Sequence, residues 1–115
     1  MSKQRRERIR ELNDAFRKYP WNDARALGRT VVTAGVNANG TEFVLRALNA
    51  VAGFDAFTPD NDPHGEHDFG IFTLDGERIM WKLDYYDVNC RYGSEDPSDP
   101  SKTTRVLTVM LAEEY

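Results

Sequence analysis

The dipeptide Asp75-Gly76 constrains the fold of this 115-residue chain more than any other feature, because it stands between two segments of alternating apolar residues. Asp-Gly in this position is typical of a two-residue type I′ turn. Such a turn fixes the register of the hairpin and predicts three facing pairs, Leu74 with Glu77, Phe72 with Ile79 and Gly70 with Trp81. We expect the Trp81 ring to lie over Gly70, which has no side chain.

The two faces of this hairpin differ in composition. One face is apolar and suited to helix packing, with Phe72, Leu74, Ile79, Trp81, Leu83 and Tyr85. The other face is mixed, with Phe69, Ile71, Arg78, Met80, Lys82, Asp84 and Tyr86. Phe69, Ile71 and Met80 offer a homodimer through this second face as an alternative.

Hydrophobic spacing predicts the remaining elements. A helix is expected over 3–19 and ends at Pro20, and a second helix contains Val44, Ala47, Leu48 and Val51 at the i, i+3, i+4, i+7 spacing. Strands are expected over 30–36 and 103–113, with a helix as the alternative for the latter. Turn residues occupy 37–40, and 93–102 is predicted as an exposed acidic loop.

These elements predict one α+β domain over 1–115, since a chain of this length usually forms one core. The expected architecture is an antiparallel sheet of about four strands with two helices on one face, in the order helix, strand, helix, hairpin, strand.

The segment before the hairpin concentrates the side chains that could bind a metal or transfer a proton. Both histidines and several carboxylates lie between 60 and 68, and the candidate metal ligands are Asp60, Asp62, His64, Glu66 and His67. The segment resembles the start of a calcium-binding loop, but its twelfth position is Ile71 instead of glutamate. We therefore expect no cofactor, with a divalent metal as the alternative. The simplest structural explanation is local turns, with His67 bonded to Asp84.

An enzyme is the alternative function. If the hairpin pairing continues past Asp68, His67 falls opposite Asp84, with Lys82 and Tyr86 nearby on the same strand. This arrangement would bring an acid, a base and a cation together for acid–base or metal-assisted chemistry. No serine or cysteine stands in a recognisable nucleophile motif, and Cys90 is expected to be a small buried thiol.

Charge is distributed unevenly along the chain. Residues 1–54 hold 10 Lys/Arg against 5 Asp/Glu, whereas residues 55–115 hold 5 against 14. A protein partner with a basic surface is therefore expected to approach the second half, where the candidate contacts are Asp84, Asp87, Glu95, Asp96 and Asp99. The arginines of the first helix are interrupted by acidic residues, so nucleic acid is an unfavoured partner.

Two further observations concern location. No apolar run is long enough to span a bilayer, and no signal peptide is evident, so membrane association is not expected. A lone cysteine can form no internal disulfide. A cytoplasmic protein is the simplest interpretation.

Three stretches carry a resemblance. Residues 57–70, 81–87 and 103–115 resemble the hallmark stretches of a small uncharacterised family, a domain of unknown function found mostly in alphaproteobacteria and their plasmids and phages. The resemblance implies no catalytic residues, only a setting among mobile elements. By analogy, it makes an inhibitor of a host defence system, of the anti-CRISPR or anti-restriction type, a reasonable expectation. Together with the acidic half, this favours a non-catalytic protein-binding module.

Overall fold

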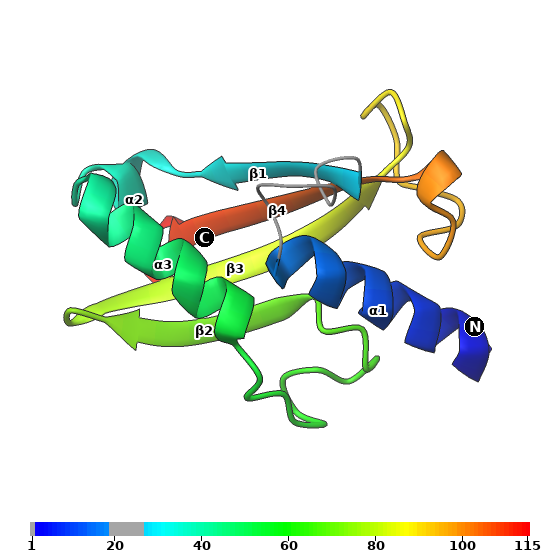
Figure 1. Ribbon diagram of the computed structural model, residues 1–115, viewed down its shortest axis with the longest axis horizontal. Helices are drawn as coiled ribbons and strands as arrows, with labels where there is room; N and C mark the ends of the chain where they lie inside the picture. The colour runs from blue at the N-terminus through cyan, green and yellow to red at the C-terminus, as the bar shows by residue number, and fades with distance from the viewer. Residues whose placement is uncertain (1, 19–26) are drawn as a thin grey trace.

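The computed structural model describes residues 2–18 and 27–115 of the chain, shown in Figure 1. Its helices are α1 (Lys3–Lys18), α2 (Ala34–Asn37) and α3 (Thr41–Gly53). Its strands are β1 (Gly28–Val32), β2 (Phe69–Leu74), β3 (Glu77–Tyr86) and β4 (Thr104–Leu111), and the short 3-10 helices are η2 (Pro100–Lys102) and η3 (Ala112–Glu114). The predicted first helix and last strand are confirmed within a few residues, while Tyr19 and Pro20 lie outside the described residues.

The four strands form a single sheet in the order β1-β4-β3-β2. The α+β class, the strand number and the two helices on one face agree with the sequence prediction. The sheet is mixed, however, because β1 pairs in parallel with β4, whereas antiparallel pairs were expected throughout. The cause is the helical connection from β1 to β2, which returns across the sheet before the next strand starts, as parallel strands require. The antiparallel pairs β2–β3 and β3–β4 each reverse the direction of the chain, so β4 runs in the same direction as β1.

The hairpin has the predicted register. Leu74 faces Glu77, Phe72 faces Ile79, and Gly70 faces Trp81. Asp75 and Gly76 have φ of 51° and 82°, as a type I′ turn demands. A side chain on Gly70 would collide with the Trp81 indole and the Phe54 ring, which confirms that Trp81 occupies the space above this glycine.

The core lies between the helices and one face of the sheet, and Figure 1 shows α1 and α3 on the same side of the strands. From the helices, Phe16, Ala47, Leu48 and Val51 enter the core. From the sheet, the central strands contribute Ile79, Trp81, Leu83, Leu107, Val109 and Leu111. Burial of this shared apolar surface holds the layers together.

The predicted strand over 30–36 is wrong beyond Val32, because Ala34–Asn37 form the short helix α2. The cause is a distant carboxylate. Glu114 accepts hydrogen bonds from the Thr33 hydroxyl at 2.7 Å and from the Gly35 amide at 3.1 Å, and so satisfies a donor at the start of this helix. Nothing in the local sequence reveals that partner.

Candidate functional site

The segment between α3 and β2 is fastened to α1 by His67. Its ring stacks on Phe57, with centroids 3.8 Å apart and planes 4° apart. Its Nδ1 lies 3.0 Å from a carboxylate oxygen of Asp14 on α1. Phe57 in turn meets Trp81 edge-on, which places the imidazole on the helix side of the sheet. His67 therefore anchors a loop to the core.

The tip of this loop is built from local hydrogen bonds. The buried Asp62 carboxylate accepts hydrogen bonds from the backbone amides of Glu66 and His67, each at 3.2 Å. The Gly65 amide donates to the carbonyl of Asp62 at 3.1 Å and has φ of 67°, which closes the predicted tight turn. Asp62 thus stabilises its own turn.

A buried polar network lies beneath the loop. Asn13 of α1 donates to the Tyr85 hydroxyl at 2.8 Å and to the Glu66 carbonyl at 3.0 Å. Tyr85 donates to the Glu66 carboxylate at 2.7 Å, and Arg105 donates through Nε to the Asn13 amide oxygen at 2.7 Å. Burial and the hydrogen bond to Glu66 raise the pKa of Tyr85 well above its usual range, so this phenol stays protonated.

A second buried cation closes the C-terminal end of α3. Arg17 donates to the carbonyls of Val51 at 2.6 Å and Phe54 at 2.8 Å, and it pairs with Asp14 at 2.9 Å. Its guanidinium also lies 5.0 Å from the centre of the Trp81 ring. A cation at a helix C-terminus interacts favourably with the free carbonyls there. Arg17 is therefore a structural residue that joins both helices to the core.

Sequence reasoning missed these buried polar residues, although signals exist. Asn13 falls on the same helical stripe as Ile9 and Phe16, and Arg105 shares its strand parity with Leu107. A polar residue at a core-facing position needs a buried partner.

The predicted pairing of His67 with Asp84 is wrong. The β2–β3 ladder ends at Phe69 and Lys82, and His67 leaves strand geometry with φ of 55°. Asp84 instead pairs with Lys82 at 3.0 Å, and this hydrogen bond raises the pKa of Lys82. Asp84 and Lys82 share strand parity with Tyr86, on the face opposite Trp81. The imidazole and the other candidate catalytic residues therefore lie on opposite sides of the sheet.

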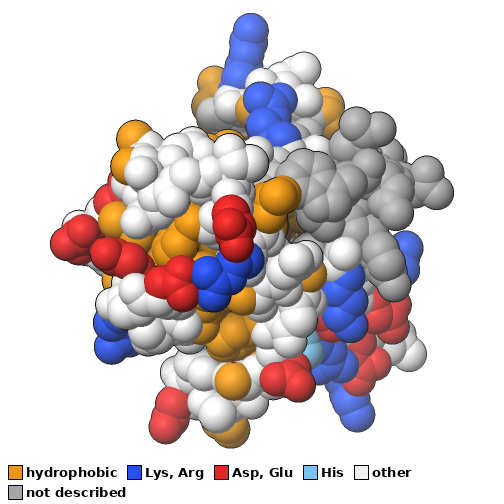
Figure 2. Space-filling view, turned by 60° about the vertical axis from the view of Figure 1, so that its left-hand side comes forward, with side chains coloured by type: hydrophobic (Ala, Val, Ile, Leu, Met, Phe, Trp, Pro, Cys, Tyr) orange, Lys and Arg blue, Asp and Glu red, His pale blue; other side chains and the backbone are white. Residues whose placement is uncertain are grey.

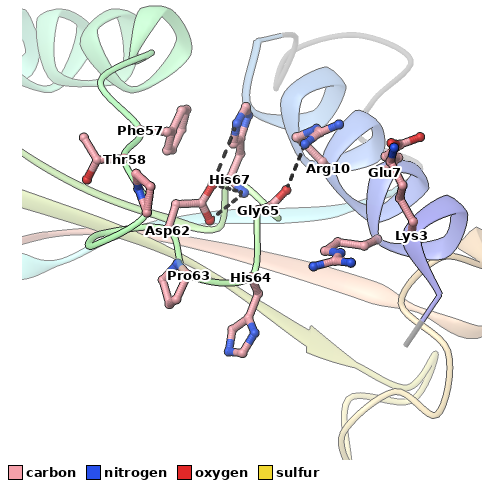
Figure 3. A pocket seen from close by; sticks show the side chains of 12 residues that line it. Lys3, Glu7, Arg10, Phe57, Thr58, Asp62, Pro63, His64, Gly65 and His67 are labelled. Carbon is pink, nitrogen blue, oxygen red and sulfur yellow. Dashed lines mark hydrogen bonds and ion pairs between the residues drawn. The ribbon is translucent and has the colours of Figure 1, made fainter.

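His67 Nε2 lies 3.8 Å from a carboxylate oxygen of Asp62, but the other candidate metal ligands do not converge on this pair in the described structure. Figure 3 shows the imidazoles of His64 and His67 pointing in opposite directions. Asp62 and Glu66 are bonded within the loop and to Tyr85, and Asp60 is exposed. Within residues 2–18 and 27–115, no three His, Cys, Asp or Glu side chains are arranged to hold a metal ion.

Four of the five candidate partner contacts lie in residues 87–103, which we call the acidic protrusion. Asp87 accepts hydrogen bonds from the amides of Asn89 and Arg91, at 3.1 and 3.0 Å. Asp99 caps η2 through the Ser101 amide at 2.9 Å. Glu95 is highly exposed and lies 3.6 Å from Lys102.

Two arginine side chains help to tie the acidic protrusion to the rest of the fold. Asp96 pairs with Arg5 of α1 at 2.9 Å, and Arg105 donates to the Pro97 carbonyl at 2.6 Å. The hydrogen bond from the Ser98 hydroxyl is the main cause that lowers the pKa of Asp96. At the tip, Val88 and Tyr92 are 57% and 74% exposed. Cys90, expected to be buried, is exposed there with φ of 56°.

A groove separates α1 from the loop that follows α3, with a volume of about 540 Å³. We call it the basic groove. Lys3, Arg6 and Arg10 line its helix side, and Phe57, Pro59 and Pro63 line its loop side, as Figure 3 shows in part. Arg10 donates to the Gly65 carbonyl at 3.4 Å.

The other surfaces are less distinctive. Of the residues predicted for a homodimer contact, Met80 is 5% exposed and Ile71 37%, while Phe69 is half-buried, so little of that apolar set is free. Figure 2 shows the side of the molecule that is leftmost in Figure 1, with acidic and basic side chains next to each other over exposed apolar patches. The Arg46–Asp75 pair, at 2.6 Å, joins α3 to the hairpin turn.

None of the described helices is both long and apolar enough to cross a membrane. The described structure defines a small α+β protein with a buried polar network, an acidic protrusion and a basic groove. The family described as a protein of unknown function (DUF3768) matches residues 32–114. The chain belongs to this family, in agreement with the resemblance to a domain of unknown function. Comparison with curated proteins and with solved structures found no match.

Proposed function

We propose that this protein is a non-catalytic protein-binding module whose acidic protrusion docks on a basic surface of a protein partner. The observation that carries the proposal is the exposed Tyr92, 74% accessible at the tip of a loop whose backbone is held by its own carboxylates. Tyrosine is enriched among the residues that dominate binding energies, usually within a polar rim. Val88 and Glu95 supply the apolar and acidic neighbours of such a contact.

The construction of the acidic protrusion supports this function. Asp87, Asp96 and Asp99 fix the loop from within, and Arg5 and Arg105 attach it to α1 and β4. A loop that is ordered before binding loses less conformational entropy when it meets a partner. Residues 55–115, with 14 Asp/Glu against 5 Lys/Arg, add a field that speeds encounter with a basic surface.

In its more specific form, the proposal names a component of a host defence system as the partner. Proteins that act on DNA carry basic surfaces for the phosphate backbone, and an acidic protein can occupy them. The mobile-element setting implied by the resemblance suggests a CRISPR effector or a restriction enzyme. The expected readout is survival of a phage or plasmid in cells that express such a system together with this protein.

Two substitutions test the docking surface and keep the hydrogen bonds by which Asp87, Asp96 and Asp99 hold the loop; Glu95→Lys gives up only the exposed ion pair with Lys102. Tyr92→Ala removes only a side chain, because the hydrogen bond at this position joins the Tyr92 carbonyl to the Asp87 amide. Glu95→Lys reverses an exposed charge. Matched controls are Tyr115→Ala and Glu113→Lys, which change exposed residues at the other end of β4.

Partner recovery by a tagged protein, and protection in the challenge assay, should fall at least about tenfold for Tyr92→Ala, the scale of a binding hot spot. Both controls should behave as the unmodified chain does. Equal recovery for Tyr92→Ala, Glu95→Lys and their controls, with thermal unfolding unchanged, would remove the acidic protrusion as the docking surface.

A further inference from the structure

The basic groove has features of a binding site independent of the acidic protrusion. Its volume of about 540 Å³ falls within the range of ligand pockets. Within the described residues, no ion pair joins Lys3, Arg6 or Arg10 to a carboxylate. Other basic side chains are in ion pairs, for example Arg5 with Asp96 and Arg46 with Asp75. Three cations thus face one groove without a local counter-charge in ion-pair contact.

The acidic groups of the groove cancel only part of this charge. Asp62 lies in the wall, but its carboxylate accepts the backbone amides of Glu66 and His67 and is buried. Glu7 is the other carboxylate in the lining, four residues after Lys3 and three before Arg10 on the same face of α1, so it offsets one of the three positive charges. The net positive charge of the lining therefore favours an anionic ligand. Glu7 would repel a ligand that carries negative charge along its whole length.

The cations form a row. Lys3, Arg6 and Arg10 are spaced by three and four residues, so they follow one face of α1 over roughly 10 Å at 1.5 Å per residue. An extended peptide advances roughly 7 Å for every second residue. Two carboxylates on alternate positions of a peptide can therefore meet this row.

The opposite wall is apolar. Pro59 and Pro63 line it together with Phe57, whose ring is covered on one side by His67. Proline has no backbone donor, so this wall offers surface for an apolar side chain. Phe57 is the one Phe, Tyr or Trp side chain in the described lining, and its ring is already stacked on His67, so the groove offers nucleic-acid bases little beyond the small His64 imidazole.

We propose that the basic groove binds an extended acidic peptide segment of a protein partner, with carboxylates on the side of Arg6 and Arg10 and an apolar side chain against Pro59 and Pro63. This site lies apart from the acidic protrusion and does not depend on the proposed function. The ligand class follows from the charge complementarity between the row on α1 and the peptide.

The test starts from a random-peptide display library selected on the full-length protein. Enriched sequences should carry Asp or Glu on alternate positions with an apolar residue between them. One enriched peptide, labelled with fluorescein, is then titrated by fluorescence polarisation, beside the same sequence with Gln and Asn in place of its acids. The acidic form should bind and the neutral form should bind at least tenfold more weakly.

The diagnostic variant is Arg6→Glu, and its matched control is Arg8→Glu, since Arg8 is exposed on the same helix and does not line the groove. Arg6 lies in the first turn of α1, where an acid is favourable to the helix dipole, and Arg8 gives up only an exposed ion pair with Glu11 at 3.5 Å, so α1 should persist in both variants. Arg6→Glu should weaken peptide binding at least tenfold, and Arg8→Glu less than threefold. Tyr92→Ala should leave it unchanged, which separates this test from that of the acidic protrusion.

Three outcomes would overturn the proposal. The first is a library selection without acidic enrichment. The second is equal weakening by Arg6→Glu and Arg8→Glu, which would show diffuse attraction instead of a site. The third is tighter binding of a labelled single-stranded oligothymidine than of the peptide, with Arg6→Glu abolishing it, which would make the groove a nucleic-acid site.

Discussion

The amide oxygen of Asn13 accepts a 2.7 Å hydrogen bond from Nε of Arg105, a residue 92 positions further along the chain. Both side chains are fully buried. The bond joins α1 to β4, and Arg105 continues it through the Pro97 carbonyl into the acidic protrusion. One buried cation therefore links the helix layer, the sheet and the proposed docking surface. Burial lowers the pKa of Arg105, but arginine remains charged and needs its acceptors.

We predict that Asn13→Ala lowers the free energy of unfolding by about 2–4 kcal/mol, because it removes the acceptor of the buried Arg105 cation and the two hydrogen bonds that Asn13 donates to the Tyr85 hydroxyl and the Glu66 carbonyl. Urea denaturation measures the change. Asn49→Ala, an exposed position on α3, is the matched control and should stay within about 0.5 kcal/mol. Similar values for the two variants would contradict a structural role for the network.

The two loop histidines should respond differently to alanine. His67→Ala removes the stacked ring on Phe57 and the contact with Asp14, so we expect a loss of about 1–3 kcal/mol. His64 is exposed, and His64→Ala should be nearly neutral. Repeating the denaturation with EDTA tests the metal alternative. A chelator that destabilises the unmodified chain, together with equal losses for both variants, would indicate a shared metal site instead.

The hairpin could be predicted from the sequence because its information is local. Asp75-Gly76 sets the turn, and strand parity then assigns Trp81 and Leu83 to the core face. The extension of that logic to His67 failed, since parity holds only while the chain stays extended. The positive φ of His67 ends the strand, and Asp62, five residues earlier, holds this turn through the His67 amide.

The rest of the candidate site depends on contacts between distant parts of the chain. The strand order that places β4 beside β1 brings Arg105 under α1, and no local pattern indicates which buried acceptor it finds. The pairing of Arg5 with Asp96 likewise joins segments 91 residues apart. Charge counts predicted an acidic surface, but they could not show that Asp87, Asp96 and Asp99 hold the loop from within.

Two glycines provide a packing test of the core. At Gly70 an added Cβ would lie 2.9 Å from an atom of the Phe54 ring and would also collide with Trp81. Gly70→Ala should therefore cost about 1–3 kcal/mol of stability, the usual penalty of overpacking. Gly53→Ala meets nothing within 4 Å at the end of α3 and should be neutral or gain up to about 1 kcal/mol. Urea denaturation of the two variants beside the unmodified chain measures both changes in stability. A Gly70→Ala variant as stable as the unmodified chain would mean that Trp81 does not cover this position tightly.

Glu114 should make part of the stability of this protein dependent on pH. Its hydrogen bonds from the Thr33 hydroxyl and from the Leu111 and Gly35 amides lower its pKa from the ordinary glutamate value. Because the folded pKa is the lower one, the unfolded chain binds the proton more readily as the pH falls. The stabilisation is therefore complete above the pKa of the unfolded chain, about 4.3, and is lost as the pH falls through the lower pKa of the folded state.

Glu114→Gln should lower the urea midpoint at pH 7, and its difference from the unmodified chain should shrink in acid. Glu113→Gln, the exposed neighbour, should show no such pH-dependent difference. A difference for Glu114→Gln that stays constant from pH 7 to pH 3 would mean that the carboxylate charge does not hold α2 to the end of β4.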